Sequence, residues 1–241
     1  MKLRELLKKR EFIIAVPIPV RNVETVSKVK SVISKYRDVI DIVEFRLDYL
    51  EDIDDVESVT NEILRINHPK IITIREVSEG GFREISHQVK LKVISDLQSM
   101  ESTYVDLEYN FFNRYSIDVS KYSGVIISEH YINDKPVLNE LLTKLKTLDV
   151  NPYIDVYKIA VSVNNLQELK LLIDFTIEAE RIKNRIYLAV MPMCNCKLWR
   201  IIFPILRSKI MYCSLIETTA KGQLNLNECL AFREFIKNLQ A

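Results

Sequence analysis

Glycine is scarce in this chain of 241 residues, and its scarcity excludes two common nucleotide-binding motifs. Only Gly80, Gly81, Gly124 and Gly222 occur. Neither the G-x-G-x-x-G pattern of dinucleotide-binding folds nor the G-x-x-x-x-G-K-[ST] pattern of P-loop enzymes can be written with them. We therefore expect neither kind of protein.

Cysteine is also rare, with Cys194, Cys196, Cys213 and Cys229 as the four examples. The pair Cys194/Cys196 has no second pair of ligands and no histidine close by in the sequence. A zinc site usually needs four such ligands, so we expect no bound metal. Reduced, partly buried thiols are the ordinary interpretation of all four.

An excess of charge of either sign is absent, because 34 Lys and Arg face 33 Asp and Glu. Such a balance gives no overall basic field for nucleic acid or an anionic membrane, and we expect neither partner. No apolar run approaches the roughly 20 residues of a membrane helix. The basic first ten residues are followed by no apolar segment of the secretory type before Arg21 and Glu24. We expect a cytoplasmic protein.

What the chain does contain is ample apolar material, 48% of its residues, in alternating short runs and helical patterns. Short β-branched runs, each bounded by polar or turn residues, predict strands at 12–17, 42–47, 70–75, 103–107, 124–128, 153–161, 185–191 and 210–214. Apolar residues at helical spacing predict helices at 23–36, 56–66, 89–99, 137–148, 165–180 and 226–239. Eight strands alternating with helices predict a (β/α)8 TIM barrel, an α/β fold, as one domain over residues 1–241. A doubly wound open sheet is the rival.

Charged residues stand on one face of several predicted strands. In the second strand Phe45 and Leu47 share a face, whereas Glu44, Arg46 and Asp48 share the other. Helices cover the outside of a barrel, so the charged trio must point inward or over the mouth. Unpaired charges there would cost several kcal/mol, and we expect them to pair with one another or with a ligand.

Polar or charged side chains also share one face near the ends of four other predicted strands. They are Thr73 and Arg75, Asp106 and Glu108, Ser128 and His130, and Lys158. Catalytic groups of barrel enzymes gather at the C-terminal ends of the strands, so these residues predict a functional pocket. A polar layer of structural ion pairs is the alternative.

Lys158 stands in an otherwise apolar strand and is the sharpest candidate. Burial and cations such as Arg46 or Arg75 would lower its pKa, whereas nearby carboxylates would raise it, and the sequence leaves the balance open. A neutral lysine amine can attack a carbonyl to form a Schiff base. His130 could move protons near neutral pH. We expect the other two histidines, His68 and His87, at the surface.

Six ordered motifs give the chain a resemblance to the type I 3-dehydroquinate dehydratase family over nearly its whole length. They are Glu44-Phe-Arg46-Leu-Asp48, Thr73-Ile-Arg75 with Glu79-Gly80-Gly81, Ser128-Glu-His130-Tyr, Tyr157-Lys158-Ile-Ala-Val, Ala189-Val-Met-Pro192 and Ala220-Lys-Gly222-Gln223. The resemblance implies conversion of 3-dehydroquinate to 3-dehydroshikimate and water, without a metal or dissociable cofactor. It also implies that Lys158 forms an imine with the ring ketone.

Further roles come from the same resemblance. His130 would remove the C2 proton and help the C1 hydroxyl leave in a net syn elimination, with Glu79 as the carboxylate beside the catalytic pair. Glu44, Arg46 and Arg75 would hold ring hydroxyls and Arg200 the substrate carboxylate, while Thr219 and Gln223 would belong to a closing loop. The listed positions depart from the family pattern at Trp199, where many relatives have serine, and at Lys221, where proline is usual.

Two other functions compete with this interpretation. A class I aldolase would also use a lysine, but those acting on sugar phosphates usually carry a glycine-bearing phosphate loop after the seventh or eighth strand, and the seventh loop here has none. A non-catalytic, carboxylate-binding barrel would be signalled by loss of Lys158 or His130, and both are present.

Relatives form homodimers, and the apolar stretch 199–206 is a candidate contact or a buried helix.

Overall fold

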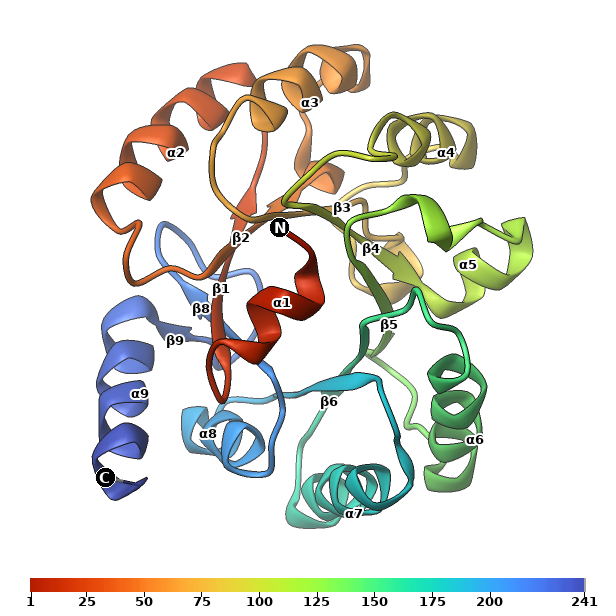
Figure 1. Ribbon diagram of the computed structural model, residues 1–241, viewed down its shortest axis with the longest axis vertical. Helices are drawn as coiled ribbons and strands as arrows, with labels where there is room; N and C mark the ends of the chain where they lie inside the picture. Colours follow the sequence, from red (N-terminus) through yellow and green to blue (C-terminus); the bar gives the residue numbers. More distant parts are fainter. Residues whose placement is uncertain (241) are drawn as a thin grey trace.

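The computed structural model describes residues 1–240, in which parallel strands alternate with helices around a closed ring (Figure 1). The barrel strands are β1 Ile13–Pro19, β2 Ile42–Arg46, β3 Lys70–Thr73, β4 Thr103–Glu108, β5 Val125–Tyr131, β6 Val156–Ser162, β7 Tyr187–Met193 and β8 Ile210–Ser214. Each predicted strand is present. Because β1 pairs with both β2 and β8, the sheet curls back on itself, which confirms the (β/α)8 barrel and excludes the open doubly wound sheet.

The backbone hydrogen bonding between neighbouring strands is not the same all the way around the barrel. Parallel ladders connect each neighbouring pair of strands from β8 through β1 to β7. Between β7 and β8, by contrast, residues 1–240 form no ladder. One backbone hydrogen bond, from Lys209 N to Leu188 O at 2.7 Å, and one from Val190 N to the Ser208 hydroxyl at 2.9 Å join the two sides there.

Helices cover the outside of the barrel. Six were predicted and are α2 Val23–Lys35, α3 Val56–Leu64, α4 His87–Asp96, α6 Leu138–Asp149, α7 Leu166–Ile182 and α9 Leu226–Gln240. Polar side chains cap several of them; the Asn22 and Asn165 side chains, for example, accept from backbone N–H groups in the first turn. The prediction did not include α1 Leu3–Lys8 and α5 Tyr109–Tyr115, which are too short to show a clear period. The stretch 199–206, for which a buried helix was one of two interpretations, lies mostly in α8 Lys197–Ile205. The sequence also gave no sign of the short strand β9 Leu224–Asn225, which pairs with β8.

Two apolar layers follow from the alternation of side chains along the strands. Outward-facing residues such as Val43 and Phe45 pack against the helices in the larger layer. Inward-facing residues such as Ile42 and Ile71 fill the barrel, and Leu3 and Leu7 of α1 join them. This inner layer occupies the N-terminal ends of the strands and leaves the C-terminal ends to polar groups.

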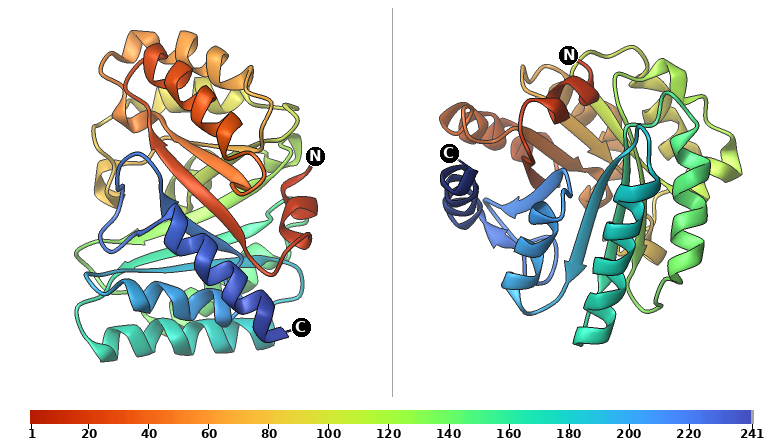
Figure 2. Two further views of the ribbon diagram at one scale, coloured as in Figure 1. Left: turned by 90° about the vertical axis from the view of Figure 1, so that its left-hand side faces the viewer. Right: turned by 60° about the horizontal axis from the view of Figure 1, so that its bottom comes forward.

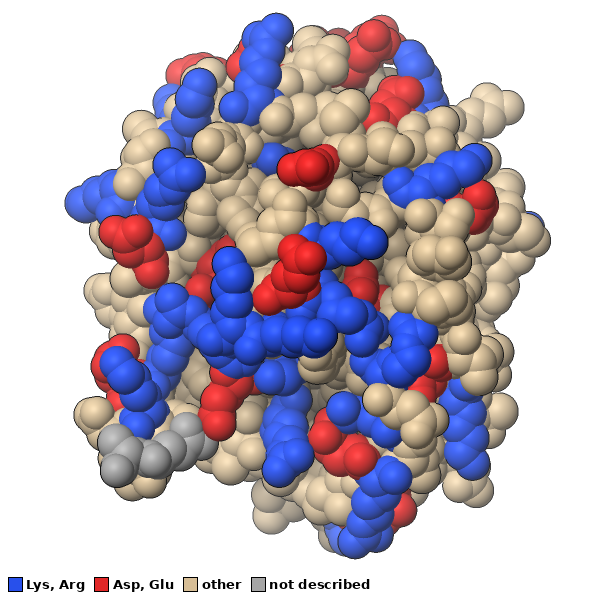
Figure 3. Space-filling view, in the orientation of Figure 1, with Lys and Arg blue, Asp and Glu red and all other residues tan. Residues whose placement is uncertain are grey.

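Helix α1 closes the N-terminal end of the barrel, opposite the loop that follows β8 (Figures 1 and 2). Outside this apolar seal, basic side chains gather on the same face, among them the exposed Lys8, Lys9 and Arg10 (Figure 3). Charge is therefore distributed unevenly over a chain whose formal net charge is only +1.

Two expectations from the sequence were wrong. Cys213 of β8 and Cys229 of α9 form a disulfide, whereas Cys194 and Cys196 remain free thiols, so only the second pair is reduced as expected. His68 is buried rather than exposed, because it follows α3 and lies under the N-terminal end of the barrel. Short-range sequence patterns cannot reveal either feature, since both depend on contacts between distant segments.

No helix within residues 1–240 is both long enough and apolar enough to cross a membrane.

A substitution at Leu7 tests whether α1 seals the N-terminal end of the barrel. Its side chain is fully buried. Leu7→Ala should lower the free energy of unfolding by about 2–5 kcal/mol, because it removes buried methyl groups and leaves a cavity. Denaturant titration measures this loss. Lys8→Ala, a change at the exposed neighbouring position, should alter stability by less than about 0.5 kcal/mol. Equal effects of the two changes would show that α1 does not seal the barrel.

Candidate active site

A pocket opens at the C-terminal end of the barrel, where the predicted charged residues meet. The nine residues to which the sequence analysis gave a role in the site all line it: Glu44, Arg46, Arg75, Glu79, His130, Lys158, Arg200, Thr219 and Gln223. Gly80, Ile132, Ala160, Met191, Met193, Tyr212 and Ala220 complete the wall. The strands bring these residues together because side chains at the same register point inward from neighbouring strands; Lys158, for example, lies opposite Ser128 and Ala189.

Lys158 is buried at the floor of this pocket. Its Nζ lies 2.8 Å from Asp106 Oδ2 and 3.3 Å from Glu44 Oε1. Burial alone would lower the pKa of Lys158, but the two carboxylates outweigh it and raise the pKa above its usual value. The balance that the sequence left open is therefore settled in favour of an ammonium ion in the resting site.

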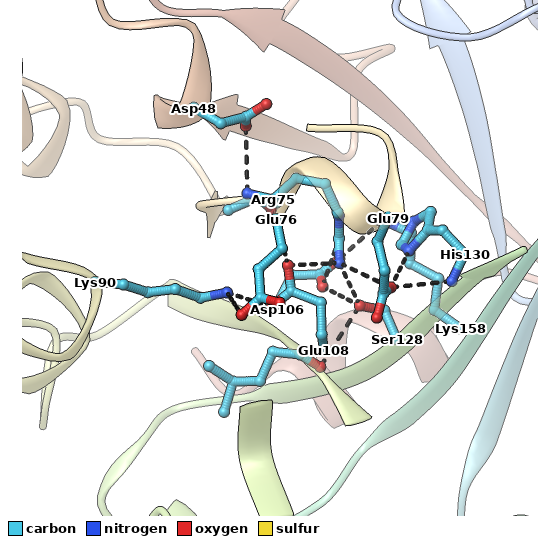
Figure 4. A network of polar contacts seen from close by, with 12 residues as sticks. Asp48, Arg75, Glu76, Glu79, Lys90, Asp106, Glu108, Ser128, His130 and Lys158 are labelled. Carbon is cyan, nitrogen blue, oxygen red and sulfur yellow. Dashed lines mark hydrogen bonds and ion pairs between the residues drawn. The ribbon is translucent and has the colours of Figure 1, made fainter. Parts of the chain in front are cut away.

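Asp106, near the end of β4, forms ion pairs with cations of the pocket (Figure 4). Besides Lys158, its carboxylate accepts from Arg75 Nη2 at 2.8 Å and from the Ser128 hydroxyl at 2.5 Å. Burial opposes ionisation of Asp106, yet Arg75 and Lys158 hold its pKa below the usual range. Both of its oxygens are thus engaged in holding positive groups.

A second carboxylate, Glu108, two residues after Asp106 in β4, also holds Arg75. Glu108 Oε1 lies 3.3 Å from Arg75 Nη1 and accepts from Glu76 N at 2.9 Å. Its other oxygen pairs with Lys90 of α4, which is buried and also lies over the Phe111 ring (Figure 4). The guanidinium of Arg75 is therefore fixed from two directions, and the backbone that leads to Glu79 is fixed with it.

Glu79 lies on a tight turn, η3 Val77–Glu79, directly after Arg75. Gly80 ends the turn with φ of 83°, and a Cβ at Gly81 would lie 2.1 Å from the Arg75 carbonyl oxygen. Glycine is needed at both positions to fold the loop back over the pocket. Burial raises the pKa of Glu79 to about 8, with Glu108 and Asp106 adding to the rise and Arg75 opposing it.

His130, at the end of β5, is held by Glu79. Glu79 Oε2 lies 3.0 Å from both the His130 backbone nitrogen and His130 Nδ1. Burial, together with the cations Arg75 and Lys158, lowers the pKa of His130 well below its usual value. A neutral imidazole, oriented by a carboxyl group, therefore faces a pocket with a buried amine.

Arg200 of α8 is a cation in the wall of the pocket, and no carboxylate of residues 1–240 neutralises its charge. Within residues 1–240, no carboxylate lies within ion-pair distance of it, and its Nε has no hydrogen-bond partner. Its one hydrogen bond runs from Nη2 to the Lys221 carbonyl oxygen at 2.8 Å. Burial lowers the pKa of Arg200 to about 10, so it remains positive at neutral pH. Such a group is suited to bind an anion that enters the pocket.

The loop after β8 borders Arg200. Within this loop, the Gln223 side-chain oxygen accepts from Thr219 N at 3.0 Å. Gly222 has a φ of 66°, and a Cβ there would lie 1.9 Å from the Cys194 carbonyl oxygen, so the loop packs directly on the segment after β7. The backbone of Lys221, where proline was expected, supplies the carbonyl that holds Arg200.

Two pocket residues escaped assignment from the sequence. Asp106 was noticed for its alternation in β4 but was given no role, because its position between two cations depends on distances across the barrel. Tyr212 of β8 was missed completely, since a tyrosine in an apolar strand is typical of a barrel core. An aromatic residue with a polar tip at an inward position was the only available signal.

Comparison with known proteins agrees with this geometry. The family model described as Type I 3-dehydroquinase matches residues 14–240. A 3-dehydroquinate dehydratase of Saccharolobus solfataricus is 25% identical over 229 residues, covering 94% of this chain and 96% of that protein. One from Thermodesulfovibrio yellowstonii is 30% identical over 195 residues, covering 78% of this chain and 82% of its own. The crystal structure of a Geobacillus kaustophilus 3-dehydroquinate dehydratase has the same fold, with a TM-score of 0.80 at 21% identity over 94% of this chain and 91% of that one.

The raised pKa of Glu79 makes a prediction about stability. Folded Glu79 keeps its proton up to about pH 8, whereas an unfolded glutamate releases its proton near 4.5. The folded state therefore binds more protons between these values, and Glu79 costs stability increasingly as the pH rises through that window. Glu79→Gln removes the titrating group and should gain stability relative to the wild type, by at most about 1.4 kcal/mol per pH unit.

Denaturant unfolding at a series of pH values from 5 to 8 measures this difference. Glu84→Gln is the matched control, because it makes the same chemical change at an exposed position of the same loop. A stability difference between Glu79→Gln and the wild type that stays constant with pH would contradict the prediction.

Proposed function

Because the chain belongs to the type I 3-dehydroquinase family, we propose that it converts 3-dehydroquinate to 3-dehydroshikimate and water, the hydro-lyase step of the shikimate pathway. The observation that carries the proposal is the Lys158 side chain at the floor of a pocket that is also lined by His130, Glu79 and the six residues expected to bind the substrate. Residues 1–241 would act as one domain, a proposal supported by the membership of all barrel strands in one sheet.

The first chemical step is imine formation. The resting ammonium of Lys158 must lose a proton before its nitrogen can attack the C3 ketone of the substrate. His130 is neutral in the resting site and is the base that can accept this proton. Attack gives a carbinolamine, and the imidazolium returns its proton to the carbinolamine hydroxyl, which leaves as water. This leaves His130 neutral again beside an iminium ion, which acidifies the neighbouring C2–H. No metal or dissociable cofactor enters this scheme.

The elimination then needs one positioned base that becomes an acid. His130 removes the C2 proton, the electrons move into the iminium, and the protonated imidazole delivers its proton to the C1 hydroxyl as it leaves as water. One imidazole can do both on one face, which suits a net syn elimination. Glu79 is a positioning residue in this scheme, supported by its two contacts with His130.

Substrate binding uses the charges that remain. Arg200 would hold the substrate carboxylate, a role supported by its lack of an ion-pair partner. Glu44, Arg46 and Arg75 would hold ring hydroxyls; Arg46 is fixed for this by a two-pronged contact with Asp48 at 2.7 and 2.8 Å. The loop of Thr219 and Gln223 would close over the substrate and exclude water from the imine.

The chain would work as a homodimer in the cytoplasm. Helix α8 supports the dimer, because Leu198 and Ile205 are 70% and 60% exposed on it. Phe235 and Leu239 of α9 are 58% and 68% exposed nearby, and Ile236 lines the same groove as Ile205. Contiguous apolar side chains of this kind are typical of protein–protein contacts. The disulfide is unusual for a reducing cytoplasm, where such bonds are rare outside hyperthermophiles.

Borohydride trapping tests the function. The wild type incubated with 3-dehydroquinate should gain a reduced adduct on the peptide that carries Lys158, and the product enone should appear by its ultraviolet absorption. Lys158→Ala should lose both, with activity falling roughly a thousandfold or more, as when a nucleophile is removed. Lys144→Ala is the control, because Lys144 pairs with Glu129 outside the pocket. A folded wild type that gives neither adduct nor enone would overturn the proposal.

Sedimentation of two variants tests the dimer. The wild type should sediment with the mass of two chains. Leu198→Glu combined with Ile205→Glu should shift it to one chain, because charges buried at the contact would lack partners. Val150→Glu, directly after α6 on another side of the barrel (Figure 1), changes an exposed apolar residue (81%) and should leave the dimer intact. A double variant that stays dimeric would place the contact elsewhere.

A further inference from the structure

The Tyr212 side chain carries a buried hydroxyl whose hydrogen has no acceptor. The residue is 6% exposed, and among residues 1–240 its hydroxyl has no hydrogen-bond partner at ordinary bonding distance; its polar contact is with the Lys158 ammonium, which can only donate. A buried hydroxyl left in this state costs free energy, so such groups are rare unless they serve a purpose. Phenylalanine would fill the same space without this cost.

The hydroxyl lies beside the nucleophile. Tyr212 belongs to β8 and lines the pocket, and Lys158 Nζ lies 4.5 Å from the centre of its ring. Burial raises the pKa of Tyr212, with the Lys158 ammonium opposing that rise from close by. The phenol therefore stays protonated and available as a donor beside the atom that attacks the substrate.

No acceptor within residues 1–240 lies within hydrogen-bond distance of this hydroxyl. The two carboxylates that act on it electrostatically, Asp106 and Glu44, both accept from Lys158 instead. Rotation of the phenol hydrogen alone therefore cannot give Tyr212 an acceptor. The missing acceptor must arrive with what binds to Lys158.

We propose that the Tyr212 hydroxyl is a further catalytic group, which donates a hydrogen bond to the oxygen on the carbon that Lys158 attacks. This inference rests on the proposed function. In the ketone that oxygen is the carbonyl oxygen, and in the carbinolamine it is a hydroxyl two bonds from Nζ. A donor beside Nζ is therefore also beside this oxygen throughout the step.

The step balances without ionisation of Tyr212. The Nζ lone pair forms the C–N bond as the C=O π electrons move to oxygen, which takes up the proton that the nitrogen loses after addition. The C–O bond then breaks as the C=N bond forms, and the oxygen leaves as water with the proton that His130 had taken from the ammonium. Tyr212 keeps its own proton and stabilises the negative charge that develops on oxygen. It would serve the reverse reaction, hydrolysis of the product imine, in the same way.

Tyr212→Phe isolates the hydroxyl. One neutral hydrogen bond is expected to contribute about 3- to 10-fold, so the rate of adduct formation in rapid-quench borohydride trapping should fall by that factor. Thermal stability should stay the same or rise, because the change removes an unsatisfied buried group. Loss of rate without loss of stability is a result that a merely structural tyrosine would not give.

Tyr104→Phe is the matched control. Tyr104 is also a buried tyrosine inside the barrel, but its hydroxyl donates to the Met1 carbonyl oxygen at 3.2 Å, at the end opposite the pocket. Its removal should lower the melting temperature and leave the trapping rate unchanged. The two variants should therefore show opposite patterns of stability and rate.

The outcomes separate this inference from the proposed function. A wild type that forms no adduct overturns the function, and the role of Tyr212 with it. A wild type that forms the adduct, with Tyr212→Phe trapping at the same rate, overturns Tyr212 alone. A Tyr212→Phe variant that melts clearly below the wild type would show that the hydroxyl has a structural partner, which also overturns it.

Discussion

The pocket depends on one buried carboxylate, Asp106, that holds two cations apart and in place. Arg75 and Lys158 each contact it at 2.8 Å, inside a barrel where an unpaired charge would be costly. The same contact keeps Lys158 protonated until substrate arrives, and the two cations in turn keep His130 neutral. The proposed nucleophile, Lys158, and the proposed base, His130, therefore start in opposite protonation states because of their shared surroundings.

The barrel separates an apolar end from a charged end along its own axis. Helix α1 and the inner apolar layer fill the N-terminal end, so the ion pairs of the other end lie on a dry, closely packed floor. Low polarity beneath the charges strengthens their interactions and makes incomplete pairing costly. Of the five buried polar side-chain atoms without a hydrogen-bond partner within residues 1–240, two line the pocket, Nε of Arg200 and the hydroxyl of Tyr212.

The fold and most of the pocket could be predicted from sequence, because period-2 alternation reveals both the strands and the charges on their inner faces. The direction of the pKa shift of Lys158 could not be predicted, because it depends on the distances from Lys158 to Asp106 and Glu44, which only the folded barrel sets. The Cys213–Cys229 disulfide and the burial of His68 depend on contacts between distant segments. Tyr212 was missed because an aromatic side chain in a strand carries the same signal whether its hydroxyl is satisfied or not.

Few hydrogen bonds join β7 to β8, and this gives the two sides of the pocket unequal structural support. Lys158 stands on β6, whose neighbours on both sides are joined to it by full ladders, and the base stands on β5 beside it. Arg200 and the loop of Thr219 and Gln223 belong to the segments around the contact between β7 and β8, where fewer hydrogen bonds must break for local opening. The proposed catalytic pair thus rests on the part of the barrel with continuous ladders, and the residues proposed to bind and cover the substrate rest beside the part with few hydrogen bonds.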